Sequence, residues 1–292
     1  MSSASVQAIF SLVRGDRIPF PAGDLTPRDV IDACIAHEVA GLVVDRLAGR
    51  DDWPVEIAEA LTRQVSADAA IELLRRRELG RVIEAVGASG AESILIKGAA
   101  LAYTLYDAPY CRPRVDTDLL IRRGDVDAVR NALARLGYRA SVLCEGEAVF
   151  CQFEMSRFDE FGVEHVCDFH WKISTQPVFA EVLSYDELRQ GAIRVAALGP
   201  RALAAASVES LLLACVHPAM HHRNAQRTVW IHDIHLLVSK LSEADLLRFA
   251  TLAREKKVAH VCADALRRAR AMFHTTLPEP VLVALRPSAG GG

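Results

Sequence analysis

The feature that most restricts the possible folds of this chain is a change in its apolar periodicity. Over residues 1–88 apolar side chains recur at helical spacing, and Thr26-Pro27-Arg28-Asp29 supplies the hydroxyl, proline and acid that begin a helix. Trp53-Pro54 opens a second long helical stretch that runs to the glycines near residue 90. From about Ala202 onward the spacing is helical again. The pattern predicts two helical regions on either side of a different central region.

The central region alternates between strand-like and helical segments. Ser93–Ile96 is a short run that contains β-branched residues, and Val115–Ile121 alternates between the two faces of a strand. Further segments are strands over Tyr138–Leu143, Val149–Met155 and Val163–Ile173, and helices over Ala99–Tyr106 and Asp125–Leu136. Strands that alternate with helices and then follow one another predict an α+β core rather than a doubly wound sheet. We expect an N-terminal helical region at 1–88, the α+β core at 89–199, a C-terminal helical region at 200–286 and a disordered tail at 287–292.

Composition excludes several classes of function. With 51% hydrophobic residues and a net charge of −3, the 292-residue chain has ample material for a packed core and no basic excess for an extended nucleic acid. No apolar run reaches the ~18–20 residues of a membrane helix, and the first residues lack the layout of a signal peptide. The seven cysteines form no C-x-x-C pair. We therefore expect a cytoplasmic protein that has no membrane partner.

Two aspartates mark the candidate chemistry. Asp116 and Asp118 are two residues apart in a predicted strand, so their side chains point to the same face. Like charges so placed repel one another unless a cation lies between them, and paired hard oxygen ligands suit Mg²⁺. Asp168 is a candidate third acid, and it shares a strand face with His170. The competing interpretation is a solvated strand face, which the neighbouring apolar residues disfavour.

A turn before the predicted strand suggests a phosphate site. Gly98 follows Lys97 and precedes a helix, so backbone there can approach a phosphate closely, with help from the helix dipole. Arg112 and Arg114 are candidate phosphate contacts because guanidinium groups match phosphate oxygens, although they could equally pair with acids of the protein. Lys97 could supply charge to a phosphate or point away from it.

These motifs together resemble the uncharacterised nucleotidyltransferases of the polymerase-β-like superfamily. The order is strand, Lys97-Gly98, helix, Arg112-x-x-x-Asp116-x-Asp118-Leu119-Leu120, then a strand carrying Asp168-x-His170-Trp171. The likeness spans about residues 80–275 and continues into the C-terminal helices through His217, His221-His222, Arg227, Trp230 and Asp233.

The resemblance implies a nucleotidyltransferase fold with a mixed sheet core, in which three carboxylates hold two divalent metals, Mg²⁺ or alternatively Mn²⁺. Carried over by position, Asp116 and Asp118 would be metal ligands, and Asp168 the third ligand and base. Lys97, Gly98, Ala99, Arg112 and Arg114 would bind the nucleotide. Ala99 departs from the Gly-Ser that superfamily members usually have, so a hydroxyl near the β- and γ-phosphates is missing.

The C-terminal histidines and acid are open to more than one interpretation. His170, His217, His221, Arg227 and Asp233 are candidates for an acceptor pocket, or the last three could simply join two helices. Pro218 makes it doubtful that one helix carries both His217 and His221. His232-Asp233 also permits a metal phosphohydrolase of the His-Asp type, but no suitably placed final Asp accompanies it.

The sequence thus predicts a Mg²⁺-dependent enzyme that transfers a nucleotidyl group from a nucleoside triphosphate to a hydroxyl or phosphate of a small-molecule or peptide acceptor. One alternative is an atypical transferase or hydrolase of phosphorylated substrates that uses the same metal site. Another is a degenerate module that binds a nucleotide or a partner without catalysis. The acceptor, the preferred base and the oligomeric state cannot be deduced from the sequence.

Overall fold

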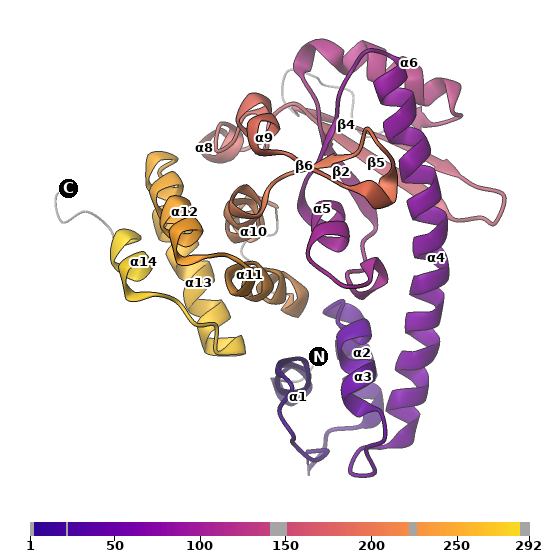
Figure 1. Ribbon diagram of the computed structural model, residues 1–292. Coiled ribbons are helices and arrows are strands. Elements are labelled where there is room, and N and C mark those ends of the chain that lie inside the picture. Colours follow the sequence, from indigo (N-terminus) through magenta and orange to yellow (C-terminus); the bar gives the residue numbers. More distant parts are fainter. Residues whose placement is uncertain (1–2, 22, 141–150, 222–226, 287–292) are drawn as a thin grey trace.

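A computed structural model of the chain describes residues 3–21, 23–140, 151–221 and 227–286. The N-terminal region is helical, as predicted, and its last helix runs along one side of the molecule up to the sheet (Figure 1). Its helices are α1 (Ser3–Arg14), α2 (Pro27–Ala36), α3 (Ala40–Leu47) and α4 (Val55–Ala88). Helix α2 begins at the predicted signal, where the Thr26 hydroxyl accepts a hydrogen bond from the Asp29 backbone N–H and the Asp29 carboxylate accepts one from the Thr26 N–H.

The central region contains a sheet of seven strands in the described residues, in the order β3-β4-β5-β2-β1-β7-β6. The β2–β5 and β1–β7 pairs are parallel and the others antiparallel, so the predicted mixed α+β core is confirmed. The strands are β1 (Ile94–Leu95), β2 (Asp116–Leu120), β3 (Arg139–Ala140), β4 (Gln152–Phe158), β5 (Glu164–His170), β6 (Ile193–Arg194) and β7 (Leu203–Ala204). Helices among them are α5 (Lys97–Thr104), α6 (Val126–Arg135), α8 (Pro177–Ala180) and α9 (Tyr185–Gly191).

Some predicted elements differ from the structure at their ends. Strand β4 continues to Phe158, three residues past the predicted end, because it pairs with β5 along its whole length. Residues 141–150, which include the start of that predicted strand and the end of the one before it, lie outside the described residues, as does the predicted disordered tail at 287–292. Strand β7 belongs to the sheet although it follows residue 199, where we placed the end of the core.

The C-terminal region is helical, as predicted. It comprises α10 (Ser207–His221), α11 (Thr228–Lys240), α12 (Glu243–Glu255), α13 (Ala259–Phe273) and α14 (Glu279–Ala284). Helix α10 continues through Pro218, which answers the doubt that the proline raised. In the part of the chain that the structure describes, no helix combines the length and the apolar character needed to span a membrane.

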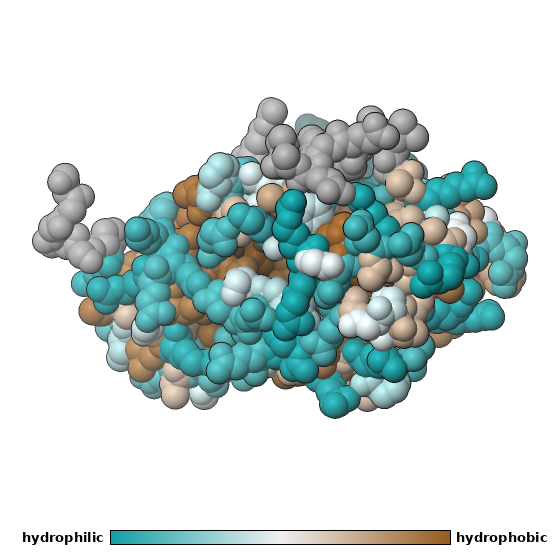
Figure 2. Space-filling model, turned by 90° about the horizontal axis from the view of Figure 1, so that it is seen from above, coloured by the Kyte–Doolittle hydropathy of each residue, from teal (hydrophilic) through white to brown (hydrophobic). Residues whose placement is uncertain are grey.

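Two apolar cores lie on opposite faces of the sheet. One joins the sheet to α4 and α6 and includes Leu119 and Phe169. The other is larger and includes Leu120 together with residues of the N-terminal and C-terminal helices. Seen from above, the surface is mainly hydrophilic, with apolar side chains visible between the polar ones (Figure 2). The two cores fix which face of β2 carries Leu119 and which carries Leu120, and this alternation also orients the aspartates.

Candidate metal and nucleotide site

Parallel pairing of β2 and β5 brings two of the predicted acids together. The register sets Asp118 opposite Asp168 and Leu120 opposite His170. Leu119 packs into the core beneath α4 and α6, so Asp118 and Asp116 emerge on the other face of the strand. The sequence predicted this shared face from the alternation alone. The adjacency of β2 and β5 is a tertiary fact that the alternation did not contain.

Asp118 is the centre of a buried polar network. Its Oδ1 atom accepts a hydrogen bond from Lys97 Nζ at 2.7 Å and lies 2.8 Å from His170 Nε2. The same His170 nitrogen lies 3.3 Å from Asp168 Oδ2, which also accepts a hydrogen bond from the Gln152 side-chain amide at 3.0 Å. His170 therefore contacts both aspartates through one nitrogen, which requires that this nitrogen carry the proton.

Charge and burial shift the pKa values in this network in opposite directions. For Asp116, partial loss of water followed by repulsion from Asp118 raises the pKa to about 6. Burial would also raise the pKa of Asp118, but Lys97 and then His170 outweigh it and hold that pKa far below its ordinary value. Burial and the Lys97 charge lower the pKa of His170, but its bonds to Asp118 and Asp168 raise it overall. Acids under such opposed influences are typical of functional sites.

The geometry fits a metal ion. Asp118, Asp168 and His170 each offer a ligand atom, and these atoms lie within 4.8 Å of one another. The second oxygen of Asp168, Oδ1, is buried and has no hydrogen-bond partner among the described residues. A buried carboxylate oxygen without a partner is costly unless an ion or water satisfies it. Asp116 lies outside this tight group but lines the same cavity.

A cavity of about 300 Å³ surrounds the network and extends to all three regions of the chain. Its lining includes the three aspartates, Lys97 and Gly98 from the core, and residues of α10 and α11. The predicted residues on its wall are Lys97, Gly98, Arg112, Arg114, Asp116, Asp118, Asp168, His170, His217, Arg227 and Asp233. The structure thus gathers almost the whole predicted set around one space.

The turn into α5 has an open helix end. Gly98 lines the cavity, and a Cβ atom there would meet only the Arg112 guanidinium, at 3.7 Å, which is ordinary contact. No side chain caps the first turn of α5. Ala99 is buried in the apolar core beneath the sheet and is not part of the cavity wall, so only its backbone could serve a nucleotide. These features suit approach of a phosphate to the helix N-terminus.

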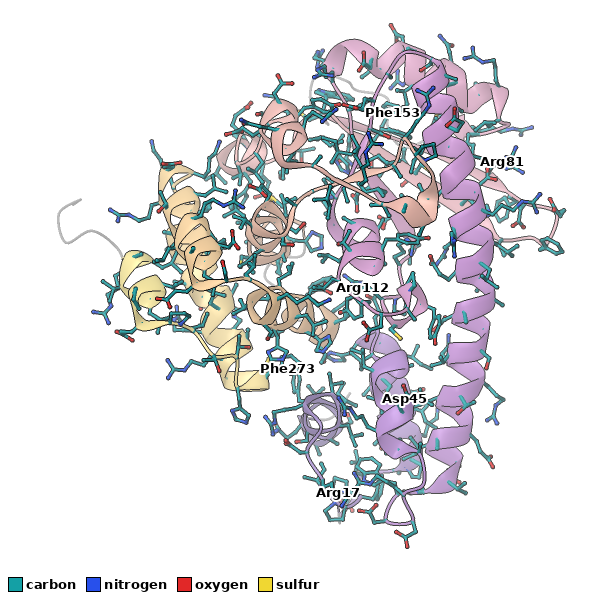
Figure 3. The ribbon with its side chains drawn as sticks, viewed as in Figure 1. Arg17, Asp45, Arg81, Arg112, Phe153 and Phe273 are labelled. Carbon is teal, nitrogen blue, oxygen red and sulfur yellow. The ribbon has the colours of Figure 1, made fainter. Side chains whose placement is uncertain are left out.

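Both candidate arginines are held in buried ion pairs. Arg112 Nε donates to the two carboxylate oxygens of Asp233 at 3.1 and 3.0 Å, and Figure 3 places Arg112 near the middle of the molecule. Arg114 donates to Glu72 on α4 at 2.7 and 3.2 Å. This is the alternative in which the arginines pair with acids of the protein. A role for either in phosphate binding stays a prediction.

The predicted acceptor residues divide in the structure. His217 packs its ring edge-on against Trp230, with centroids 5.2 Å apart, on the cavity wall. Asp233 is fully engaged, since it also accepts a hydrogen bond from the Tyr106 hydroxyl at 2.7 Å. This pairing argues against a His-Asp metal site at His232-Asp233. His221 ends α10, and its side chain lies outside the described residues.

Sequence reasoning missed three polar residues of the cavity lining: Glu38, Gln152 and Ser210. Glu38 lies just after α2 and forms ion pairs with Arg227 and with Arg112, the latter at 3.4 Å. It joins the N-terminal region to the other two. No local signal marks it, because its importance depends on how the residues just after α2 meet the start of α11.

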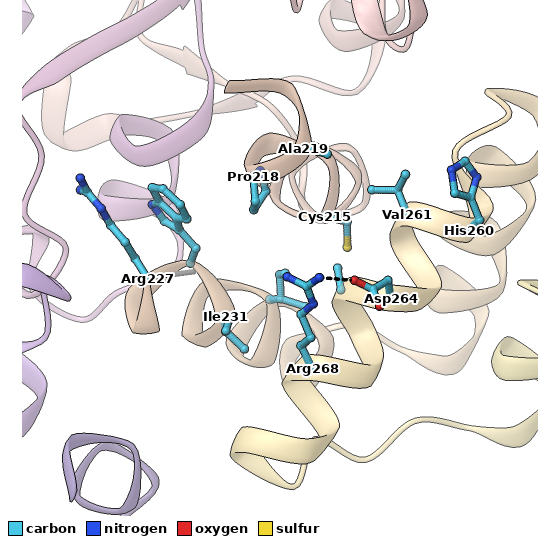
Figure 4. Close-up of a pocket in the computed structure, with 12 residues that line it drawn as sticks. Cys215, Pro218, Ala219, Arg227, Ile231, His260, Val261, Asp264 and Arg268 are labelled. Atoms are coloured by element: carbon cyan, nitrogen blue, oxygen red, sulfur yellow. Dashed lines mark ion pairs between the residues drawn. The ribbon is translucent and has the colours of Figure 1, made fainter. Parts of the chain in front are cut away.

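A second cavity of about 290 Å³ adjoins the first between α10, α11 and α13 (Figure 4). The two share Arg227 and Trp230 in their walls. The lining of the second is mainly apolar, with the Arg268–Asp264 ion pair at its edge.

The mixed sheet with flanking helices, which sets two carboxylates side by side at a cavity, is of the nucleotidyltransferase-like class. A family model described as "Uncharacterised nucleotidyltransferase" matches residues 24–274, and the chain belongs to that family. The match confirms the resemblance and begins well before residue 80, so it includes most of the N-terminal helices. Comparison with curated protein sequences yields no match. Among solved structures, the crystal structure of JHP933 from Helicobacter pylori is similar at 11% identity and a TM-score of 0.38, over 73% of this chain and 88% of that chain.

Proposed function

We propose that the protein is a Mg²⁺-dependent nucleotidyltransferase that transfers a nucleotidyl group from a nucleoside triphosphate to a hydroxyl or phosphate of a small-molecule or peptide acceptor. The observation that carries the proposal is the pairing of Asp118 with Asp168 across two parallel strands, with an unpartnered buried oxygen on Asp168 and Asp116 on the same wall. Family membership supports the type of reaction.

The residues would divide the work as follows. Asp116, Asp118 and Asp168, with His170 beside them, would hold the divalent cations, two by the family resemblance, and Mn²⁺ could replace Mg²⁺. When bound, such ions neutralise phosphate charge and lower the pKa of an acceptor hydroxyl. Gly98 would admit the phosphates to the N-terminus of α5. Asp168 would accept the acceptor's proton, and Gln152 would orient that carboxylate through its 3.0 Å hydrogen bond.

The acceptor would enter from the side of α10 and α11. His217, Arg227 and Trp230 lie on that wall, opposite the strand that carries the aspartates. Arg227 is partly exposed and forms an ion pair with Glu38. An anionic group of the acceptor could therefore replace the Glu38 carboxylate as the partner of Arg227. The cavity of about 300 Å³ fits a compact substrate and not a polymer.

The test is pyrophosphate release with each of the four nucleoside triphosphates, Mg²⁺ and candidate acceptors. Asp116→Asn removes a proposed ligand at the start of β2 without touching the Lys97–Asp118–His170 contacts, so it should fold normally. We expect turnover to fall at least 100-fold and metal-dependent nucleotide binding to weaken. Asp186→Asn, at an exposed acid remote from the cavity, is the control. Undiminished turnover in the Asp116 variant would overturn the mechanism.

The absence of a hydroxyl at Ala99 favours a second candidate, a degenerate module that binds nucleotide without transferring it. This candidate predicts no pyrophosphate release with any acceptor, and little or no added thermal stability when Mg²⁺ accompanies the nucleotide. Occupation at 100 times Kd stabilises a fold by about 2.7 kcal/mol, and in the enzyme this gain should require Mg²⁺. Melting curves recorded with nucleotide, with and without Mg²⁺, therefore separate the candidates.

A further inference from the structure

Lys97 adopts a conformation that its surroundings must impose. It is the first residue of α5 and has a φ of +53°, in the left-handed region that residues with a Cβ atom rarely adopt. Such strain persists only where the neighbouring structure fixes it, and it is concentrated at functional sites. Gly98, the next residue, could adopt a positive φ at lower cost, yet the positive φ is at Lys97.

The backbone conformation of Lys97 places its ammonium beside the three aspartates. The Lys97 side chain is only 10% exposed, and its ammonium lies 2.7 Å from Asp118 Oδ1. Burial lowers the pKa of this ammonium, but attraction to Asp118, and then to Asp168 and Asp116, raises the pKa overall. The Lys97 ammonium is therefore a buried cation that is attracted to all three proposed carboxylate ligands.

The position of the Lys97 ammonium conflicts with the binding of two divalent cations by the same aspartates. Asp118 Oδ1 already contacts two N–H groups, those of Lys97 and His170, at 2.7 and 2.8 Å. A divalent cation that used this oxygen would have to displace one of them, and its charge would repel the ammonium at close range. Three carboxylates, one ammonium and one divalent cation sum to zero charge.

We propose that Lys97 is a built-in counter-cation of the metal site. In the metal-free protein its ammonium occupies one of the cation positions among Asp116, Asp118 and Asp168, where it stabilises the fold and lowers the affinity for divalent ions. This inference rests on the proposed function for the identity of the metal ligands. It assigns Lys97 to the metal group rather than to phosphate binding.

The experiment is a calorimetric titration of the full-length protein with Mn²⁺ in the absence of nucleotide. Lys97→Met keeps most of the side-chain volume and removes the charge, and we expect it to bind Mn²⁺ at least tenfold more tightly than the wild type. Lys97→Arg keeps the charge and should show no such gain. Lys172→Met, at an exposed lysine paired with Glu181, is the matched control and should bind as the wild type does.

A second readout uses stability rather than affinity. Without metal, Lys97→Met should melt below the wild type because three neighbouring carboxylates lose their cation, and Mn²⁺ should raise its melting temperature more than that of the wild type. Lys97→Gln, which keeps a hydrogen bond to Asp118, serves if the methionine variant does not fold.

Equal or weaker Mn²⁺ binding by both neutral variants overturns the inference, because a residue that only supports the site would lose affinity on substitution. If the wild type binds Mn²⁺ and turns over nucleotide while the neutral variants gain nothing, the role of Lys97 falls and the proposed function stands. If neither the wild type nor the variants bind Mn²⁺ without nucleotide, the inference about Lys97 falls, and pyrophosphate release alone decides the proposed function.

Discussion

At the scale of single residues, His232 shows how an interior site constrains a titratable group. It lies on α11, where its Nδ1 atom is 3.2 Å from the Tyr106 hydroxyl and its ring meets Phe273 edge-on. Burial first, and then the charges of His235, Arg112 and Arg46, lower its pKa to about 3. The folded protein therefore keeps this imidazole neutral at pH values where an unfolded chain would protonate it.

A pH dependence of stability follows for His232. Its pKa is depressed on folding, so the unfolded chain binds the extra proton between about pH 6.5 and pH 3, and stability falls as pH falls through that window. We expect His232 to contribute up to about 1.4 kcal/mol of lost unfolding free energy per pH unit below 6. Urea unfolding at pH 7, 6 and 5, compared with His232→Gln, isolates this contribution. If the unfolding free energies of the two proteins change equally with pH, His232 makes no such contribution.

Some residues of the candidate site could be predicted from the sequence. The Asp116 and Asp118 pair could be found because a strand's alternation places both on one face. The partners of Arg112 and Arg114 could not, since the alternatives of phosphate and protein acid look identical in sequence. Glu72 is on α4 and Asp233 on α11, far from the arginines along the chain, and only the packing of those helices selects them.

At the scale of elements, the turn into α5 holds the testable features of the proposed nucleotide site. Gly98 is not in the left-handed region, and the space where its Cβ would lie is bordered only by Arg112. The fold therefore gives no conformational reason for a glycine at this position. The remaining reason is access for a ligand to the helix N-terminus.

Gly98→Ala should separate binding from folding. Alanine favours the helix by about 0.5–1 kcal/mol over glycine, so unfolding free energy should stay equal or rise slightly. Nucleoside triphosphate affinity should fall at least tenfold, because a methyl group enters the path of the phosphates. Isothermal titration with a non-hydrolysable analogue measures the affinity. Gly124→Ala, where nothing lies within 4 Å of the added Cβ, is the control, and equal affinity in both variants would exclude a phosphate turn at Gly98.

The elements themselves were largely predictable. Capping chemistry located the start of α2, and periodicity located α4 and α6 within a few residues and marked the C-terminal region as helical. The order of strands in the sheet could not be predicted, because β1 lies between β2 and β7 through pairings that no local pattern encodes. Strand β7 is only two residues long, too short for periodicity to reveal.

At the scale of the whole molecule, the three predicted regions share one core. Ile9 and Val30 from the N-terminal helices belong to the same apolar cluster as Leu212 and Phe249 from the C-terminal helices. Phe10 meets Phe273 edge-on, with ring centroids 6.3 Å apart. Figure 1 shows the same arrangement, with α1 near the end of α13.

Because the core is shared, we expect thermal unfolding in a single cooperative transition. Differential scanning calorimetry should give a van't Hoff enthalpy equal to the calorimetric one, and near-ultraviolet and far-ultraviolet circular dichroism should change together. Separate transitions for a helical and a sheet region would contradict a common core. On this expectation the predicted region boundaries at residues 88 and 199 do not mark independent folding units.

The parallel pairing of β2 with β5 determines when, during folding, the acids of the proposed metal site come together. Asp118 and Asp168 are fifty positions apart in the chain, and only the completed central sheet makes them neighbours. Parallel pairing closes a long loop, which forms slowly relative to local structure. A nascent or partly folded chain therefore carries its acids apart. On the proposed function, binding of divalent ions would report that the sheet has closed.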